Sequence, residues 1–323
     1  MTRKSERLAH RTPVTPAEYA SHPVPPVAER RPVVSVLHGD RRVDEYAWLR
    51  ERSDPAVRAY LEAENAYAEA VLAPVARLRD GLYDEMLARI KQTDLSVPFR
   101  EGDWYYYSRT EEGKQYPIHC RSRTEGGAEA VLLDLNVLSE GKSFMSLGAK
   151  SVSDDGHLLA YSTDDTGYRE YLLQVKDLRT GALLPVGIQR TGTVAWAADN
   201  RTLFYTLEDD AKRHYRLYRY DVLGGGEPEL VYEEGDEAFN IAVGRTRSRA
   251  WLVMETGSHT TNETRVLRAG TPSAGWTLVA ERVPEREYEV DHTGDRFLVR
   301  VNDTGRNFRV VEAPEETPGP AHW

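Results

Sequence analysis

The residues that could carry out chemistry are few and scattered along this chain. A nucleophilic serine held on a sharp turn between a strand and a helix has the pattern Gly-x-Ser-x-Gly. Only Gly141-Lys142-Ser143-Phe144-Met145 comes near that pattern, and it lacks the second glycine. No strand–turn–helix pattern surrounds the segment. We therefore predict that Ser143 is not a nucleophile, and the residues give no reason to assign any catalytic residue.

Metal and cofactor sites are not predicted either. The nine histidines are dispersed, and none forms a His-x-x-x-His pair with a third ligand at suitable spacing. His119 and Cys120 are adjacent on an expected strand, where successive side chains point to opposite faces. Cys120 is the single cysteine, which excludes an internal disulfide framework. Phosphate-binding glycine loops are absent, and Gly224-Gly225-Gly226 is interpreted as a hairpin tip.

Three pairs of aspartates fall at expected loops: Asp154-Asp155, Asp164-Asp165 and Asp209-Asp210. Aspartate in a turn commonly accepts hydrogen bonds from its own backbone. The alternative is an acidic rim that attracts a basic peptide, since successive loops of a circular repeat protein gather at its ends. The sequence leaves both interpretations open.

The overall charge narrows the class of partner. The chain has 323 residues, 52 acidic and 42 basic, for a net charge of −10. Such an acidic chain is poorly suited to nucleic acid or anionic membranes. No apolar run approaches the roughly 18 residues of a membrane span, and the basic N-terminus lacks the apolar core of a secretory signal. We expect a cytoplasmic protein with 40% hydrophobic residues, enough for a sizeable core.

The N-terminal third divides into an arm and a helical segment. Residues 1–32 are rich in proline and predict a flexible arm, and residues 33–96 predict a helical segment. Asp54-Pro55 is a helix start, because Asp can cap the first N–H groups and Pro fits the first turn. Apolar residues at helical spacing then predict helices over about 55–73 and 75–91.

From residue 97 onward the pattern changes to short strands and turns. Four turns, each following an apolar residue, lead into strands at Leu158–Ser162, Leu203–Thr206, Ala250–Val253 and Phe297–Arg300. The preceding apolar residues are Val152, Trp196, Val243 and Val290, which are 44, 47 and 47 residues apart. A period of 40–50 residues with about four strands per repeat is typical of a β-propeller. Residues 97–323 therefore predict a mainly β fold, an incomplete propeller of about four to five blades, with Trp196 in its core.

Several segments together resemble a known family. Asp44-Glu45-Tyr46-Ala47-Trp48-Leu49 and Glu62-Ala63-Glu64-Asn65-Ala66-Tyr67 resemble the N-terminal segment of the prolyl oligopeptidase family. The run from Tyr105 to Ile118 is similar to the first blade of its oligopeptidase B (protease II) branch. Further similar segments are Ser146-Leu147-Gly148, Glu170-Tyr171 and Trp196-Ala197-Ala198-Asp199-Asn200. The resemblance covers about residues 25–321.

The resemblance implies a serine peptidase that cleaves short peptides after Arg or Lys. In that family a seven-bladed propeller covers an α/β-hydrolase domain and limits substrates by size. The Ser, Asp and His of that domain match no position here, so the resemblance supplies no catalytic residue, and this chain alone is expected to be inactive. The helices at 55–91 would lose the hydrolase domain as a partner, leaving an apolar stripe of Val57, Leu61, Leu72, Leu78 and Met86.

A different class of function also stays open. A free-standing propeller-like scaffold could bind a peptide or protein partner at its loop rim, provided that the ring closes by dimerisation or with fewer blades. A stable monodisperse species without a partner domain would favour that scaffold. A coding frame that continues beyond Trp323 into Gly-x-Ser-x-Gly would favour the peptidase.

Overall fold

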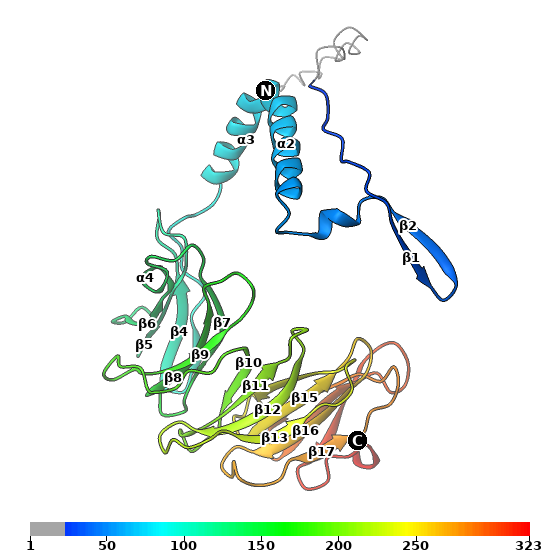
Figure 1. Cartoon of the computed structure of the whole chain (residues 1–323). Coiled ribbons are helices and arrows are strands. Elements are labelled where there is room, and N and C mark those ends of the chain that lie inside the picture. Colours follow the sequence, from blue (N-terminus) through cyan, green and yellow to red (C-terminus); the bar gives the residue numbers. More distant parts are fainter. Residues whose placement is uncertain (1–22) are drawn as a thin grey trace, which may run out of the picture. The chain divides into compact units, whose positions relative to one another are not determined.

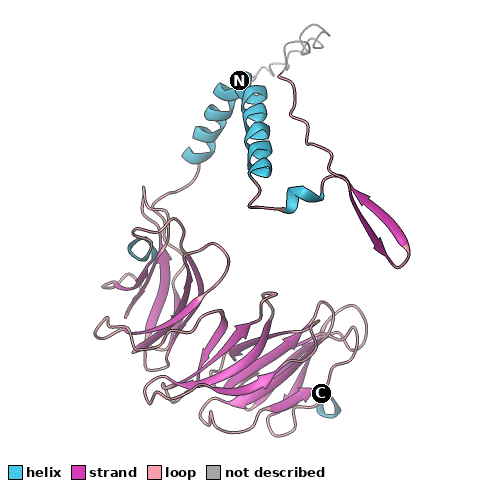
Figure 2. Ribbon diagram, viewed as in Figure 1, coloured by secondary structure: helices cyan, strands magenta, loops and turns pink. Residues whose placement is uncertain are grey.

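The computed structural model describes residues 23–323, which form two compact units. Unit 1 ends at Lys91, and unit 2 runs from Gln92 to Trp323. Unit 1 contains helices and a single hairpin, whereas unit 2 is built almost entirely of strands (Figure 2). Most of the expected proline-rich arm, residues 1–22, lies outside the described residues. Residues 23–32 have no regular secondary structure.

The two helices of unit 1 start where the sequence predicts. Helix α2 (Pro55–Leu72) is capped by Asp54, whose side chain accepts a 2.8 Å hydrogen bond from the Ala56 N–H. A short 3-10 turn, η2 (Ala73–Val75), contains Pro74 and separates α2 from α3 (Ala76–Ala88). The prediction of two helices is confirmed, although the second ends about three residues before the expected position.

A β-hairpin in unit 1 was not predicted from the sequence. Strands β1 (Val33–Leu37) and β2 (Asp40–Asp44) pair antiparallel, and a 3-10 helix, η1 (Ala47–Arg50), follows. The two turn residues His38 and Gly39 have φ of 53° and 82°. Such a two-residue turn with positive φ matches the twist of a hairpin. The sequence signal for this hairpin was weak, because Asn or Asp, and seldom His, precedes the glycine of such a two-residue turn.

Unit 2 consists of five consecutive antiparallel sheets, which we number as blades 1 to 5 in chain order (Figure 1). Within each sheet, every strand pairs with the next strand along the chain. Blade 1 has β3 (Phe99–Glu101), β4 (Trp104–Arg109), β5 (Ile118–Ser122) and β6 (Ala130–Asp134), followed by the short helix α4 (Leu135–Leu138). Blade 2 has β7 (Ser146–Val152), β8 (Leu158–Asp164) and β9 (Leu172–Asp177).

The remaining three blades repeat this plan. Blade 3 has β10 (Thr191–Trp196), β11 (Thr202–Glu208), β12 (His214–Asp221) and β13 (Glu229–Glu233). Blade 4 has β14 (Asn240–Arg245), β15 (Trp251–Gly257), β16 (Asn262–Arg268) and β17 (Thr277–Ala280). Blade 5 has β18 (Tyr288–Thr293), β19 (Arg296–Val301) and β20 (Arg309–Pro314), followed by the 3-10 helix η3 (Pro320–His322).

Blade 2 has three strands, one fewer than the four per repeat expected from the period, because no regular strand forms near residues 183–188. Only isolated bridges form there, between Lys176 and Leu183 and between Leu173 and Ile188. Pro185 lies between these bridges and has no N–H to donate to a ladder. The proline therefore prevents a regular fourth strand, and the outer edge of this blade has only the two isolated bridges.

Apolar side chains between neighbouring sheets form the core of unit 2. One cluster joins blades 3 and 4 through Phe204, Leu217, Ile241 and Leu252, and another joins blades 2 and 3 around Trp196. Trp196 is 1% exposed, and its indole N–H donates to the Ser151 carbonyl at 3.0 Å. The predicted incomplete propeller with a buried Trp196 is therefore confirmed.

Candidate functional site

Ser143 lies in an exposed loop between α4 and β7. Within the part of the chain that the structure describes, no histidine or carboxylate accepts a hydrogen bond from it. The described residues therefore supply no activating base for Ser143.

A serine–histidine–carboxylate chain that the sequence did not reveal occurs between blades 4 and 5. The Ser248 hydroxyl lies 2.8 Å from His292 Nδ1, and His292 Nε2 lies 2.7 Å from Glu315 Oε1. Acyl transfer also needs N–H donors for the oxyanion. The three N–H groups that flank Ser248 are already used: Arg247 N–H by Asp291, Arg249 N–H by Thr246 and Ala250 N–H by Ser248 itself. This chain of hydrogen bonds joins two blades and lacks an oxyanion site.

The first strands of blades 2 and 3 share a local irregularity that shapes a pocket. In each strand the register shifts at a glycine, Gly148 in β7 and Gly192 in β10. A Cβ at Gly148 would lie 2.6 Å from the Tyr171 ring, and one at Gly192 would lie 2.5 Å from the His214 ring. Glycine is therefore required at both positions, because the aromatic rings occupy the space of a side chain.

The pocket between these two strands has a volume of about 320 Å³. Its polar wall includes Arg169, Glu208, Lys212 and His214. Glu208 is buried and forms an ion pair of 3.0 Å with Lys212. Burial lowers the pKa of His214, and its Nδ1 is buried without a hydrogen-bond partner. A neutral imidazole with an unsatisfied nitrogen can bind a polar group but does not by itself perform chemistry.

A second charged cluster joins three blades through the turns that follow their first strands. Arg249, in the turn after β14, forms ion pairs with Glu101 of blade 1 and Asp154 of blade 2. Arg245 adds a 3.3 Å ion pair to Asp154 and a 2.6 Å hydrogen bond to the Trp196 carbonyl. The two ion pairs of Arg249 join residues that are 148 and 95 positions apart in the sequence, and no sequence pattern indicated them. They hold the turns of blades 1, 2 and 4 together.

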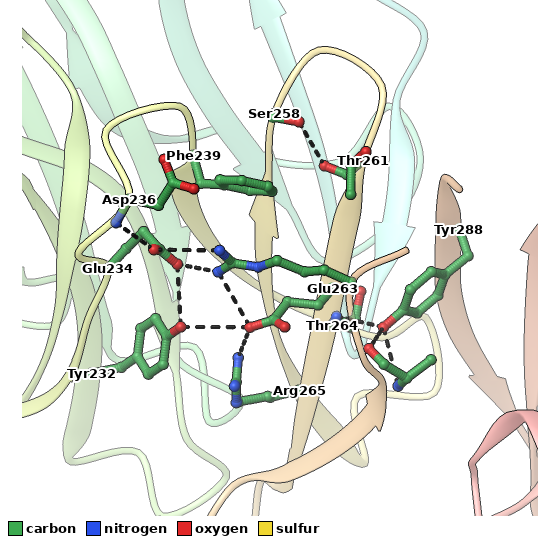
Figure 3. A network of polar contacts seen from close by, with 12 residues as sticks. Tyr232, Glu234, Asp236, Phe239, Ser258, Thr261, Glu263, Thr264, Arg265 and Tyr288 are labelled. Atoms are coloured by element: carbon green, nitrogen blue, oxygen red, sulfur yellow. Dashed lines mark hydrogen bonds and ion pairs between the residues drawn. The ribbon is translucent and has the colours of Figure 1, made fainter. Parts of the chain in front are cut away.

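A third network fixes the connection between blades 3 and 4 (Figure 3). Glu234 and Glu263 have side chains only 5% and 9% exposed, and Arg282 contacts both. The Tyr232 hydroxyl donates to Glu234 at 3.2 Å, and Arg265 donates to Glu263 at 2.5 Å. Burial alone would raise the pKa of Glu234, but hydrogen bonds from Arg282, the Asp236 N–H and the Tyr232 hydroxyl, together with the Arg282 charge, outweigh burial and hold that pKa below its usual range.

One further arginine, Arg213, and one aromatic ring, Phe239, complete that connection. The Arg282 guanidinium lies 3.9 Å from the centre of the Phe239 ring. Arg213 donates to the carbonyls of Glu234 and Asp236 at 3.2 and 2.9 Å. Both buried carboxylates are paired in this network, and only Arg282 Nε is buried without a partner. The network therefore acts mainly on the fold.

The three aspartate pairs do not form one rim. Asp154-Asp155 lies in the turn between the first two strands of blade 2, whereas Asp164-Asp165 and Asp209-Asp210 follow the second strands of blades 2 and 3. Asp164 accepts from the N–H groups of Thr166 and Arg169, and Asp209 from Ala211 and Arg213. Asp155 likewise accepts from the His157 N–H. These bonds agree with turn formation.

The remaining residues singled out in the sequence lie apart. His119 Nδ1 contacts Lys150 Nζ at 3.1 Å, and burial together with the Lys150 charge lowers the pKa of His119 to about 4. Cys120 is buried, and burial raises its thiol pKa to about 12. Gly224-Gly225-Gly226 forms a turn between β12 and β13. In residues 23–323, no group of three or more His, Cys, Asp or Glu could hold a metal ion.

Comparison with known proteins places this architecture in a family. Residues 25–323 match the model of the prolyl oligopeptidase N-terminal beta-propeller domain. This chain belongs to the prolyl oligopeptidase family. The resemblance on the quoted sequence segments is thereby confirmed, and the match includes the helical segment as well as the blades.

Individual relatives agree with that assignment. Dipeptidyl aminopeptidase BI of Pseudoxanthomonas mexicana is 40% identical over 97% of this chain and 46% of its own length. Protease 2 of Moraxella lacunata is 32% identical over 90% of this chain and 43% of its own length. The structure of oligopeptidase B from Leishmania major superposes with a TM-score of 0.81, 28% identity and 91% coverage of this chain. The chain spans less than half the length of these relatives.

None of the helices in residues 23–323 is long and apolar enough to cross a membrane.

Proposed function

We propose that this chain is the propeller part of a prolyl oligopeptidase-family serine peptidase that cleaves short peptides after Arg or Lys. The observation that carries the proposal is the match of residues 25–323 to that family's propeller domain. Identity of 32% to a protein named protease 2 supports the oligopeptidase B branch.

The role of the propeller in this proposal is to select substrates by size. Ion pairs between turns, such as Arg249 of blade 4 with Asp154 of blade 2, hold the blades in fixed positions. A folded protein would have to spend its free energy of unfolding to pass between rigid blades. A short flexible peptide has no fold to lose and can pass without that cost. The chemistry itself belongs to an α/β-hydrolase domain, because neither Ser143 nor Ser248 has the required surroundings.

The coding sequence after the codon for Trp323 gives the most direct test. We expect an open frame that encodes Gly-x-Ser-x-Gly with a downstream Asp and His. A stop codon at that position in the native gene would contradict the peptidase proposal. A monodisperse species of this chain in sedimentation would then favour the free-standing scaffold.

Activity of this chain alone provides a second test. We expect no turnover of benzoyl-arginine p-nitroanilide, because no serine of residues 23–323 combines an activating base with an oxyanion site. Ser143→Ala and Ser248→Ala are the matched controls. Turnover that disappears in either variant would show that the catalytic site lies within these 323 residues.

A second candidate activity is the release of dipeptides from a free N-terminus. The 40% identity to a dipeptidyl aminopeptidase favours it. Assays of the longer gene product with two substrates distinguish the endopeptidase from the dipeptidyl aminopeptidase. An endopeptidase cleaves benzoyl-arginine p-nitroanilide, whose N-terminus is blocked, whereas a dipeptidyl aminopeptidase requires an unblocked dipeptide p-nitroanilide.

A further inference from the structure

A groove between blades 4 and 5 has no counterpart among the residues singled out from the sequence. It has a volume of about 560 Å³ and lies beside β14 and β18, the first strands of these blades. Its apolar lining includes Ala242, Val253 and Val290. Charged residues of both signs lie among these apolar side chains.

Nearly all of the charged residues in the groove are paired. Arg300 lies 3.1 Å from Glu289, Arg247 lies 3.6 Å from Asp291, and Arg245 lies 3.3 Å from Asp154. Glu255 is the exception: within residues 23–323, no Lys or Arg lies within ion-pair distance of it. The groove therefore contains one carboxylate without a counter-charge.

The position of Glu255 explains why it is available to a ligand. Glu255 lies on β15, on the same face as Val253, and its side chain is exposed to the groove. A Cβ at Gly257 would lie 3.3 Å from Glu255 Oε1, so this glycine leaves open the space beside the carboxylate. Desolvation at the groove wall, reinforced by the charge of Glu289, raises the pKa of Glu255 against the opposing effect of a hydrogen bond from Asn262, which is uncharged.

We propose that this groove binds the side chain of an Arg or Lys residue of a peptide, with Glu255 as the partner of its positive charge. The inference rests on the proposed function only for the source of the peptide. Arg and Lys combine a cationic head with an aliphatic stem. The stem packs against Ala242, Val253 and Val290, and the head pairs with Glu255 in a partly shielded site, where an ion pair is stronger than in water.

A pair of probe peptides tests the charge requirement. Acetyl-Ala-Ala-Arg-Ala-Ala-amide carries the guanidinium, and the same peptide with citrulline is its neutral counterpart of nearly equal shape. Binding to this chain is measured by NMR titration or calorimetry. We expect the arginine peptide to bind about tenfold more tightly than the citrulline peptide, the effect of one charge-assisted contact.

Variants locate the site. Glu255→Gln should remove the preference for arginine. Glu312→Gln is the matched control, because Glu312 is an exposed carboxylate on blade 5 that pairs with Arg296 outside the groove. It should leave the preference intact. Circular dichroism confirms that each variant is folded, as expected for exposed positions.

Three outcomes would overturn the proposal: equal binding of the two peptides, no binding of either, or an arginine preference that survives Glu255→Gln. Its failure is distinguishable from failure of the proposed peptidase function. The peptide titration uses no hydrolysis, and the downstream coding sequence tests the peptidase assignment independently.

Discussion

The helices of unit 1 and the blades of unit 2 use their apolar residues in opposite ways. On α2 and α3 the stripe is largely exposed, with Leu78 57% and Met86 60% accessible, and only Val57 is buried. In the blades, Trp196, Phe204 and Leu252 are at most 1% exposed. Each large apolar side chain left in water forgoes roughly 1.5–3 kcal/mol of burial. A regular helix pattern therefore does not ensure a core, whereas stacked sheets provide their own.

The largest expected difference concerns amide exchange. Because α2 and α3 have few buried contacts, their amides should exchange at least about 100-fold faster than those of β8 and β11. Hydrogen exchange followed by mass spectrometry on this chain, with peptides covering 55–88 and 158–208, measures the difference. Equal protection of both regions in a monomeric sample would contradict the claim that the helices are less well packed than the blades.

A matched pair of truncations compares the two regions in free energy. Trp196→Ala should lower the free energy of unfolding by about 3–5 kcal/mol, because it empties a filled core position. Leu78→Ala on α3 should change it by about 0.5 kcal/mol or less, because the side chain is mostly solvated. Urea unfolding followed by circular dichroism measures both. Similar losses would mean that the exposed stripe is covered in solution.

Ion pairs allow the same comparison within unit 2. Arg282→Met should cost about 3 kcal/mol, because it leaves the buried Glu234 without its cation. Arg309→Met removes an exposed partner of Asp303 and should cost at most about 1 kcal/mol. The denaturant midpoint of each variant, compared with that of the parent chain, measures the loss of stability. A cost for Arg309→Met that matches Arg282→Met would refute the role of burial.

The smallest effect should appear in the pH dependence of stability. Against the effect of burial, Arg282, the Asp236 N–H and the Tyr232 hydroxyl together hold the folded-state pKa of Glu234 below the usual 4.5. The carboxylate therefore stabilises the fold above about pH 4.5, and this contribution is lost as pH falls through the lower folded-state pKa. Glu234→Gln should flatten that part of the profile of unfolding free energy against pH. Glu312→Gln, an exposed control, should leave its slope unchanged.

Local signals in the sequence predicted much of the fold. Asp54-Pro55 predicted the start of α2, and the repeated apolar residue before each turn predicted the blades and the burial of Trp196. These signals act over a few residues, through capping, helical spacing and alternation along strands. The hairpin of β1 and β2 was missed. The expectation of about four strands per repeat fails in blade 2, where Pro185 interrupts the fourth ladder.

The sequence by itself also determined the absence of a recognisable nucleophile motif and the resemblance to the prolyl oligopeptidase family. Only the tertiary structure decided which charges meet. Arg249 pairs with Asp154 across 95 residues, and His292 joins Ser248 to Glu315. Among the described residues, no Lys or Arg forms an ion pair with Glu255 in its groove. The physical reason is that ion pairing depends on distances of a few ångströms. The packing of the blades sets these distances, and no local pattern in the chain records them.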